Sequence, residues 1–183
     1  MQIRRSVDNR SNALKLYVDL ETLQLIEAPG FRSPVTSLRF KRGDASKLEV
    51  AFLTSAGAVY SLIGNRSTLA IEFGVKANAD YAGGYLVHET AWTMPADDAI
   101  APVYVCAPSF NTVDLNAALG VGGSTELASL TLMAEITWRE GAGEPTSTRT
   151  FTIIVENDVV RTDTAQPTTA SIGLHSALLD SIY

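Results

Sequence analysis

The fold of this chain is decided by residues 129–161, SLTLMAEITWREGAGEPTSTRTFTIIVENDVVR, where apolar side chains recur at every second position. The first run comprises Leu130, Leu132, Ala134, Ile136 and Trp138, and the second, after a turn-rich stretch at 141–145, comprises Phe151, Ile153 and Val155. A period of two places one face of a strand against a core and the other in water. The stretch therefore predicts a long antiparallel β-hairpin.

Shorter stretches with the same alternation occupy much of the chain before this hairpin. We predict strands at 14–21, with a continuation past a bend at 22–28, and at 35–41, 48–54, 59–63, 69–76, 85–93 and 103–106. The turn-forming composition of 42–46 makes 48–54 the expected hairpin partner of 35–41. Many short strands separated by turn signals indicate an all-β sandwich with Greek-key or meander connections.

One short helix interrupts the strands. Asn111 or Thr112 is suited to cap its N-terminus, and Leu115 and Leu119 supply an apolar face. Gly120 occupies the position where a left-handed residue ends a helix.

Composition narrows the function classes. The length of 183 residues fits one domain with an appendage, and a hydrophobic content of 46% is enough for a core. A net charge of −6 argues against nucleic-acid binding, which needs a basic surface. The single cysteine, Cys106, excludes an internal disulfide framework and a cysteine-rich zinc site.

The sequence gives no sign of export or membrane insertion. The N-terminal residues have no apolar run behind their arginines, so they do not form a secretory signal. No window approaches the roughly 20 apolar residues of a membrane helix. We expect a protein that is made in the cytoplasm and has no membrane partner.

Three segments follow from the pattern. Residues 1–12 are polar and predicted to be flexible, 13–161 form the β-sandwich domain, and 162–183 are a polar linker with a short amphipathic C-terminal segment. A lone helix of this length is marginal in water, so the last segment should dock onto another chain or fray. Its apolar residues are candidate partner-binding positions: Ile172, Leu174, Leu178, Leu179 and Ile182.

Reactive side chains are sparse. His88 lies within a predicted strand and is interpreted as a packed or surface imidazole, and Cys106 as a small buried hydrophobe. No spacing of ligands supports a metal site. We therefore expect no catalytic residue, cofactor or metal, while a Cys106–His88 hydrolase remains an alternative.

Three short motifs have simple structural explanations. Arg42-Gly43-Asp44 spells a cell-adhesion tripeptide, but a hairpin turn that uses glycine for positive φ explains it. The glycine-rich run at 120–123 lacks the lysine and hydroxyl residue of a phosphate loop and follows a helix instead of preceding one. Asp97 and Asp98 lack the spaced acidic ladder of a calcium site.

The large aromatic residues divide into two groups. Trp138 shares the parity of the buried row and is predicted to lie in the core. Trp92 and Tyr104 are candidate partner-binding residues, and if exposed they would also make a platform for sugars. A carbohydrate-binding sandwich is therefore an alternative function.

Three stretches resemble the N-terminal domain of tailed-phage baseplate upper proteins and related prophage tail-fibre proteins. The first is Phe40-Lys41-Arg42-Gly43-Asp44 followed by Lys47-Leu48-Glu49-Val50, the second is the strand at 69–76, and the third is the closing strand and exit at 151–161. The likeness covers about residues 35–165 and rests on short β motifs.

This resemblance implies an immunoglobulin-like antiparallel β-sandwich without catalytic activity. It implies a structural protein of the virion tail or baseplate, with other tail proteins as partners and a trimer as the favoured homo-oligomer. No long fibre or receptor-binding region follows Arg161, which departs from the family. We interpret the chain either as a truncated product or as a stand-alone adaptor whose segment 172–182 binds a neighbour. A virion head or decoration protein is a further alternative.

Overall fold

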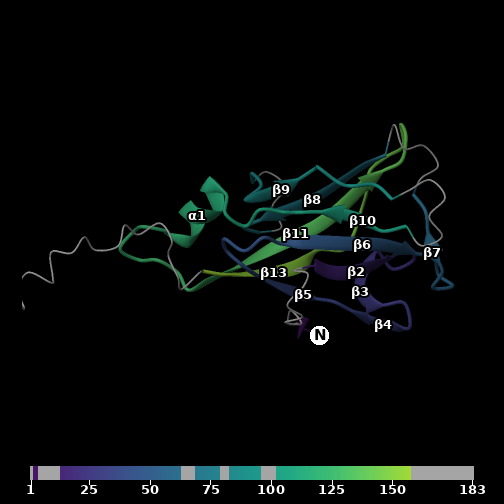
Figure 1. The fold of residues 1–183 in the computed structure, drawn as a ribbon, viewed down its shortest axis with the longest axis horizontal. Coiled ribbons are helices and arrows are strands. Elements are labelled where there is room, and N and C mark those ends of the chain that lie inside the picture. Colours follow the sequence, from purple (N-terminus) through teal and green to yellow (C-terminus); the bar gives the residue numbers. More distant parts are fainter. Residues whose placement is uncertain (1, 4–12, 63–68, 79–82, 96–101, 158–183) are drawn as a thin grey trace, which may run out of the picture.

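The computed structural model describes residues 2–3, 13–62, 69–78, 83–95 and 102–157, and it is an all-β sandwich of two packed sheets with one short helix (Figure 1). This confirms the predicted all-β sandwich. The larger sheet has the strand order β1-β5-β13-β11-β8-β9, with β12 beside β11. Its strands are β1 (Gln2–Ile3), β5 (Ser37–Lys41), β8 (Ala70–Lys76), β9 (Val87–Glu89), β11 (Ser129–Arg139), β12 (Thr146–Ser147) and β13 (Phe151–Glu156).

The smaller sheet has the order β10-β6-β2-β3-β4, with β7 beside β6. Its strands are β2 (Ala13–Asp19), β3 (Gln24–Ala28), β4 (Phe31–Pro34), β6 (Lys47–Leu53), β7 (Val59–Tyr60) and β10 (Tyr104–Cys106). The helix α1 (Val113–Leu119) lies at one end of the sandwich, on the left in Figure 1.

The hairpin predicted from residues 129–161 forms as β11 and β13, which pair antiparallel from Ser129↔Glu156 to Ala134↔Phe151. The predicted apolar parity is the buried one, because Leu132, Ile136 and Ile153 have almost no exposed surface. Residues 158–161, the end of the predicted hairpin, lie outside the described part of the chain.

The sheets are mixed, and the expectation of purely antiparallel sheets was wrong. Strand β5 runs parallel to both β13 and β1, and β2 runs parallel to β6. The expected hairpin between 35–41 and 48–54 was also wrong, because β5 and β6 belong to different sheets. The turn at 42–46 therefore crosses from one layer to the other. Both strands still bury their apolar faces, one from each side of the core.

The core is filled by side chains from both layers. Phe52 on β6 contacts the rings of Tyr104 and Trp138 edge-on, with centroids 5.4 and 5.0 Å apart. Phe40 on β5 stacks on Phe110 at 4.3 Å. The Phe52–Trp138 contact joins the two sheets, and it confirms that Trp138 lies in the core.

The helix begins and ends as its sequence predicts. Thr112 is the N-cap, since its hydroxyl accepts a hydrogen bond from the backbone N–H of Leu115 at 3.2 Å. Gly120 ends α1 with φ 68°. Leu115 and Leu119 are fully buried, so α1 closes one end of the core.

The predicted strand at 85–93 is shorter than expected. Only β9 pairs with β8, and Thr93 instead bridges Val105 of the other sheet. The segment after Glu89 therefore leaves the larger sheet and reaches β10 of the smaller sheet. At the N-terminus, Gln2–Ile3 pair with β5, while most of 1–12 and all of 162–183 lie outside the described residues.

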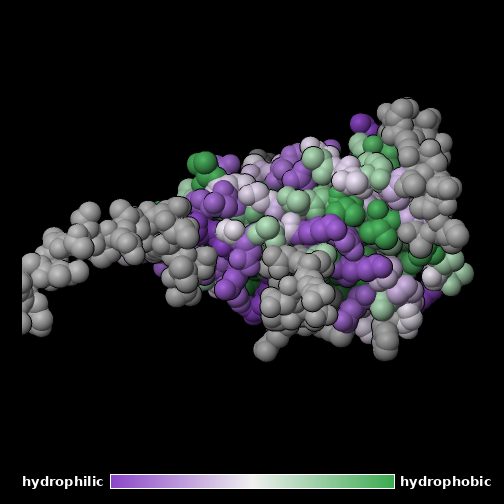
Figure 2. All heavy atoms as spheres, viewed as in Figure 1, coloured by the Kyte–Doolittle hydropathy of each residue, from purple (hydrophilic) through white to green (hydrophobic). Residues whose placement is uncertain are grey.

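The surface of the sandwich has a mixed character. Figure 2 shows hydrophilic and hydrophobic residues interspersed over the visible face. In the described part of the chain, no helix is long and apolar enough to cross a membrane.

Candidate functional site

The geometry around Cys106 does not favour a nucleophile. Cys106 is buried on β10, and this burial, aided by the charge of Glu89, raises the pKa of its thiol to about 12. A thiol with so high a pKa holds its proton at neutral pH and is a weak nucleophile. His88 does not activate it, because Nε2 of His88 lies 3.1 Å from Oε2 of Glu72 on the outer face of the other sheet.

Metal-ligating side chains do not gather in the described part of the chain. Among those residues, no group of three or more histidine, cysteine, aspartate or glutamate side chains is placed to hold a metal ion. Asp97 and Asp98 lie outside the described residues, as does the apolar C-terminal group at 172–182.

The two aromatic residues that the sequence suggests for partner binding, Trp92 and Tyr104, differ in how far they are buried. Tyr104 is fully buried, and its hydroxyl accepts a hydrogen bond from the backbone N–H of Leu62 at 2.9 Å. The suggested exposed platform of Trp92 and Tyr104 is therefore wrong, because the inward parity of β10 places Tyr104 in the core. Trp92 is half-buried and packs against the core.

A polar network holds the end of β13, and we call it the exit clamp. It consists of Arg42, Asn111, Asn116, Glu126 and Asn157. Nε of Arg42 donates to Oδ1 of Asn157 at 2.7 Å, and Nη1 donates to Oδ1 of Asn111 at 3.2 Å. Nδ2 of Asn116, on α1, donates to the same Asn111 oxygen at 2.9 Å.

The side chain of Asn157 and the backbone of Glu156 and Asn157 make further contacts in this clamp. Its Nδ2 donates to Oε1 of Glu126 at 2.6 Å and to the carbonyl of Leu127 at 3.1 Å. Its backbone N–H donates to the carbonyl of Ala128 at 2.9 Å, and the N–H of Arg42 donates to the carbonyl of Glu156 at 2.9 Å. The exit clamp therefore fixes the last described residue of the chain from two separate loops.

The exit clamp also explains the Arg42-Gly43-Asp44 tripeptide. Arg42 is buried, with 7% of its surface exposed, and its guanidinium is used inside the clamp. Gly43 adopts φ 83°, as a tight turn requires. The predicted turn with a positive-φ glycine is confirmed, but it crosses between the two sheets and does not close a hairpin. A buried arginine is not displayed to a receptor.

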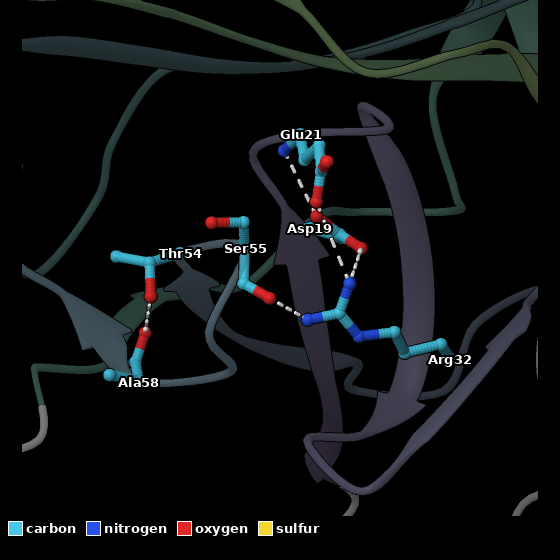
Figure 3. Close-up of polar contacts among 6 residues, drawn as sticks. All are labelled: Asp19, Glu21, Arg32, Thr54, Ser55 and Ala58. Atoms are coloured by element: carbon cyan, nitrogen blue, oxygen red, sulfur yellow. Dashed lines mark hydrogen bonds and ion pairs between the residues drawn. The ribbon is translucent and has the colours of Figure 1, made fainter.

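A second polar cluster joins three segments at the end of the smaller sheet (Figure 3). The guanidinium of Arg32, on β4, points between the carboxylates of Asp19 and Glu21, with N–O distances of 4.0 and 3.6 Å. It also donates to the carbonyl of Ser55. Asp19 is buried and accepts a hydrogen bond from the N–H of Glu21 at 2.9 Å. All of these groups are paired with one another, so the cluster is structural.

The outer face of the larger sheet carries a shallow hollow between β8 and β11 that encloses about 510 Å³, part of it open to solvent. Its floor is the backbone at Gly74 and Ala134. Its sides carry the ring of Tyr85 and the side chain of Met133, both exposed. The remaining lining side chains are polar: Glu72, Lys76, Asn78, Glu135, Thr137 and Thr150.

The ring of Tyr85 lies where a side chain at position 74 would be, and this position is a glycine. A Cβ atom on Gly74 would lie 2.5 Å from Cε1 of Tyr85, so the ring occupies the space that any other residue at 74 would fill. The Tyr85 ring stacks on His88 at 4.2 Å and 12°, and Nζ of Lys76 lies 4.8 Å from its centroid. These neighbours hold the ring upright beside the hollow.

Sequence reasoning missed both the hollow and the exit clamp. Gly74 was the available signal for the hollow, because a glycine inside a strand often marks close approach by another group. The clamp had no comparable signal, since Arg42 and Asn157 meet only when β5 pairs with β13.

In comparisons with known proteins, no protein-family model and no curated protein matches this chain.

Proposed function

We propose that this chain is a non-catalytic assembly module, an adaptor of a phage or phage-derived tail or baseplate that holds neighbouring components together. The observation that carries the proposal is the exit clamp. A module that passes the chain to a neighbour needs a fixed point of departure, and the clamp holds Asn157 through Arg42, Glu126 and the carbonyl of Ala128. The resemblance of 35–165 to tail proteins points to the same role.

The chemistry of the described residues is in keeping with this role. The high pKa of the Cys106 thiol, about 12, makes it a poor nucleophile, and His88 is paired with Glu72. We propose that binding, without bond-making, is the activity, and that the partners are other tail proteins and further copies of this chain, with a trimer favoured.

Light scattering of the full chain and of a chain without residues 166–183 tests the assembly part of the proposal. We expect the full chain to have a multiple of the monomer mass, and the shortened chain to stay folded but to dissociate more readily. Substituting Leu178 and Ile182 by serine in the full chain is the matched control for length. Equal masses for all three proteins would show that the C-terminal apolar residues do not mediate assembly.

The location in the virion has its own test. Mass spectrometry of separated head and tail fractions, from particles that encode this chain, should find it in tails. Its recovery in heads would contradict the tail proposal and favour a decoration protein.

A further inference from the structure

The geometry points to a binding site for a neutral saccharide in the hollow between β8 and β11, beside the ring of Tyr85. This goes beyond the proposed assembly role, and it uses none of the residues of the exit clamp.

The aromatic wall of the hollow is pre-formed. Tyr85 is 44% exposed, yet its ring is held by the stack on His88 and by the space above Gly74. His88 is fixed in turn by Glu72 at 3.1 Å. A ring that is already in place loses little conformational entropy on binding, and an aromatic side chain with an apolar face and a polar tip suits a sugar ring.

The polar rim supplies the hydrogen-bonding groups that hydroxyls need. Thr150 donates to Oε1 of Glu135 at 2.5 Å, and Thr137 shares a hydrogen bond of 2.8 Å with Ser147. Carboxylate and hydroxyl oxygens can accept hydrogen bonds from ligand hydroxyls. The hollow thus offers an apolar surface and convergent polar groups, as ligand sites usually do.

The charges of the hollow select a neutral ligand. Lys76 already lies over the Tyr85 ring, so a cationic ligand at that ring would meet a like charge. Glu72 and Glu135 both line the hollow, so a phosphate or an acidic sugar would be repelled by two carboxylates. A neutral sugar ring is repelled neither by Lys76 nor by the two glutamates.

The hollow is shallow and opens to solvent, so a ligand would rest on its surface and would not be enclosed. Because the hollow is shallow, we expect affinities in the micromolar to millimolar range, with one or two sugar units held.

The test is a glycan array with the full chain, followed by saturation-transfer NMR on the neutral hexose or N-acetylhexosamine oligosaccharides that bind. Tyr85→Ala should weaken binding at least ten-fold. The matched control is Tyr60→Ala, on β7 of the other sheet, because Tyr60 is 40% exposed and so similarly accessible. This control should bind like the wild type.

A second variant tests the position of the ring without removing it. In Gly74→Ala the new methyl group would lie 2.5 Å from the Tyr85 ring, which must move while the fold persists. We expect a loss of saccharide binding with an unchanged circular dichroism spectrum. The inference would be overturned if no neutral saccharide binds, if only sialylated or sulfated glycans bind, or if Tyr85→Ala binds as well as the wild type. None of these results would bear on the assembly role, which light scattering tests separately.

Discussion

Arg42 and Asn157 lie 115 positions apart in the chain, yet Nε of Arg42 donates to Oδ1 of Asn157 at 2.7 Å. This bond joins the turn after β5 to the end of β13. It is the central contact of the exit clamp, in which Arg42 is buried, Asn157 is partly buried and Asn111 is exposed.

We expect Arg42→Met to lower the free energy of unfolding by about 1.5–3 kcal/mol, since the hydrogen bonds from a buried charged group to Asn157 and Asn111 are lost. Urea denaturation measures this. The matched control is Arg39→Met on β5, where the ion pair with Glu156, at 2.5 Å, is partly exposed. That change should cost less than about 1 kcal/mol. Equal costs would mean that the clamp adds no stability.

The cluster in Figure 3 gives a second prediction. Asp19→Ala removes a buried carboxylate that accepts from the Glu21 N–H and faces Arg32, so we expect a loss of about 1–3 kcal/mol in unfolding free energy. Glu21→Ala removes the exposed carboxylate of the same cluster and should change stability by less than about 0.5 kcal/mol. Similar values for the two variants would contradict the structural role of Asp19.

Tyr104 should be a structural residue. Tyr104→Phe keeps the ring in the core but leaves the N–H of Leu62 without its acceptor, and we expect a cost of about 1–3 kcal/mol in urea denaturation. Tyr60→Phe, on the exposed strand β7, should be near neutral. If Tyr104→Phe were neutral and weakened partner binding instead, the placement of Tyr104 in the core would be wrong.

The buried thiol predicts a pH dependence. Folding raises the pKa of Cys106 from 9.0 to about 12, so between these values the unfolded chain gives up the thiol proton before the folded chain does. The contribution of this group to stability is therefore complete below pH 9 and falls as the pH rises toward 12, by up to about 1.4 kcal/mol per pH unit.

Denaturation at pH 8, 9 and 10 of the wild type and of Cys106→Ala isolates this effect from other titrating groups. The advantage of the wild type over the variant should shrink above pH 9. In the folded protein, thiol labelling at pH 8 should be at least a hundred-fold slower than in urea. A constant difference in stability across these pH values, or rapid labelling of the folded chain, would show that the thiol is accessible.

Much of the local structure could be predicted from the sequence. The alternation at 129–139 and 151–156 identified β11, β13 and their buried faces, because burial on one side of a strand imposes a period of two. The ends of α1 were also predictable, since Thr112 and Gly120 act on backbone groups within one turn.

The pairing of strands was less predictable. The turn at 42–46 predicted a hairpin between 35–41 and 48–54, but those strands face one another across the core. A polar turn is compatible with both arrangements, and the side-chain alternation is the same in each. The long β11 instead pairs with β8 on one side and β13 on the other.

The residues of the candidate site were also only partly predictable from the sequence. The sequence predicts Tyr104 as a partner-binding residue, but β10 places it in the core. Tyr85, which no sequence pattern singles out, lies beside the hollow. Only the pairing of β8 with β9 brings Gly74 beside His88, and so provides the space that the Tyr85 ring occupies.

By itself, the sequence determined that this protein is all-β, which faces of β11 and β13 are buried and where its helix begins and ends, because each of these depends on neighbours a few positions away. The tertiary structure decided that β5 lies parallel to β13, that Arg42 reaches Asn157 and that Tyr85 lies over Gly74. The physical reason is that backbone hydrogen bonds are alike for every pair of strands, so the choice of neighbour is settled only when both layers close over one core.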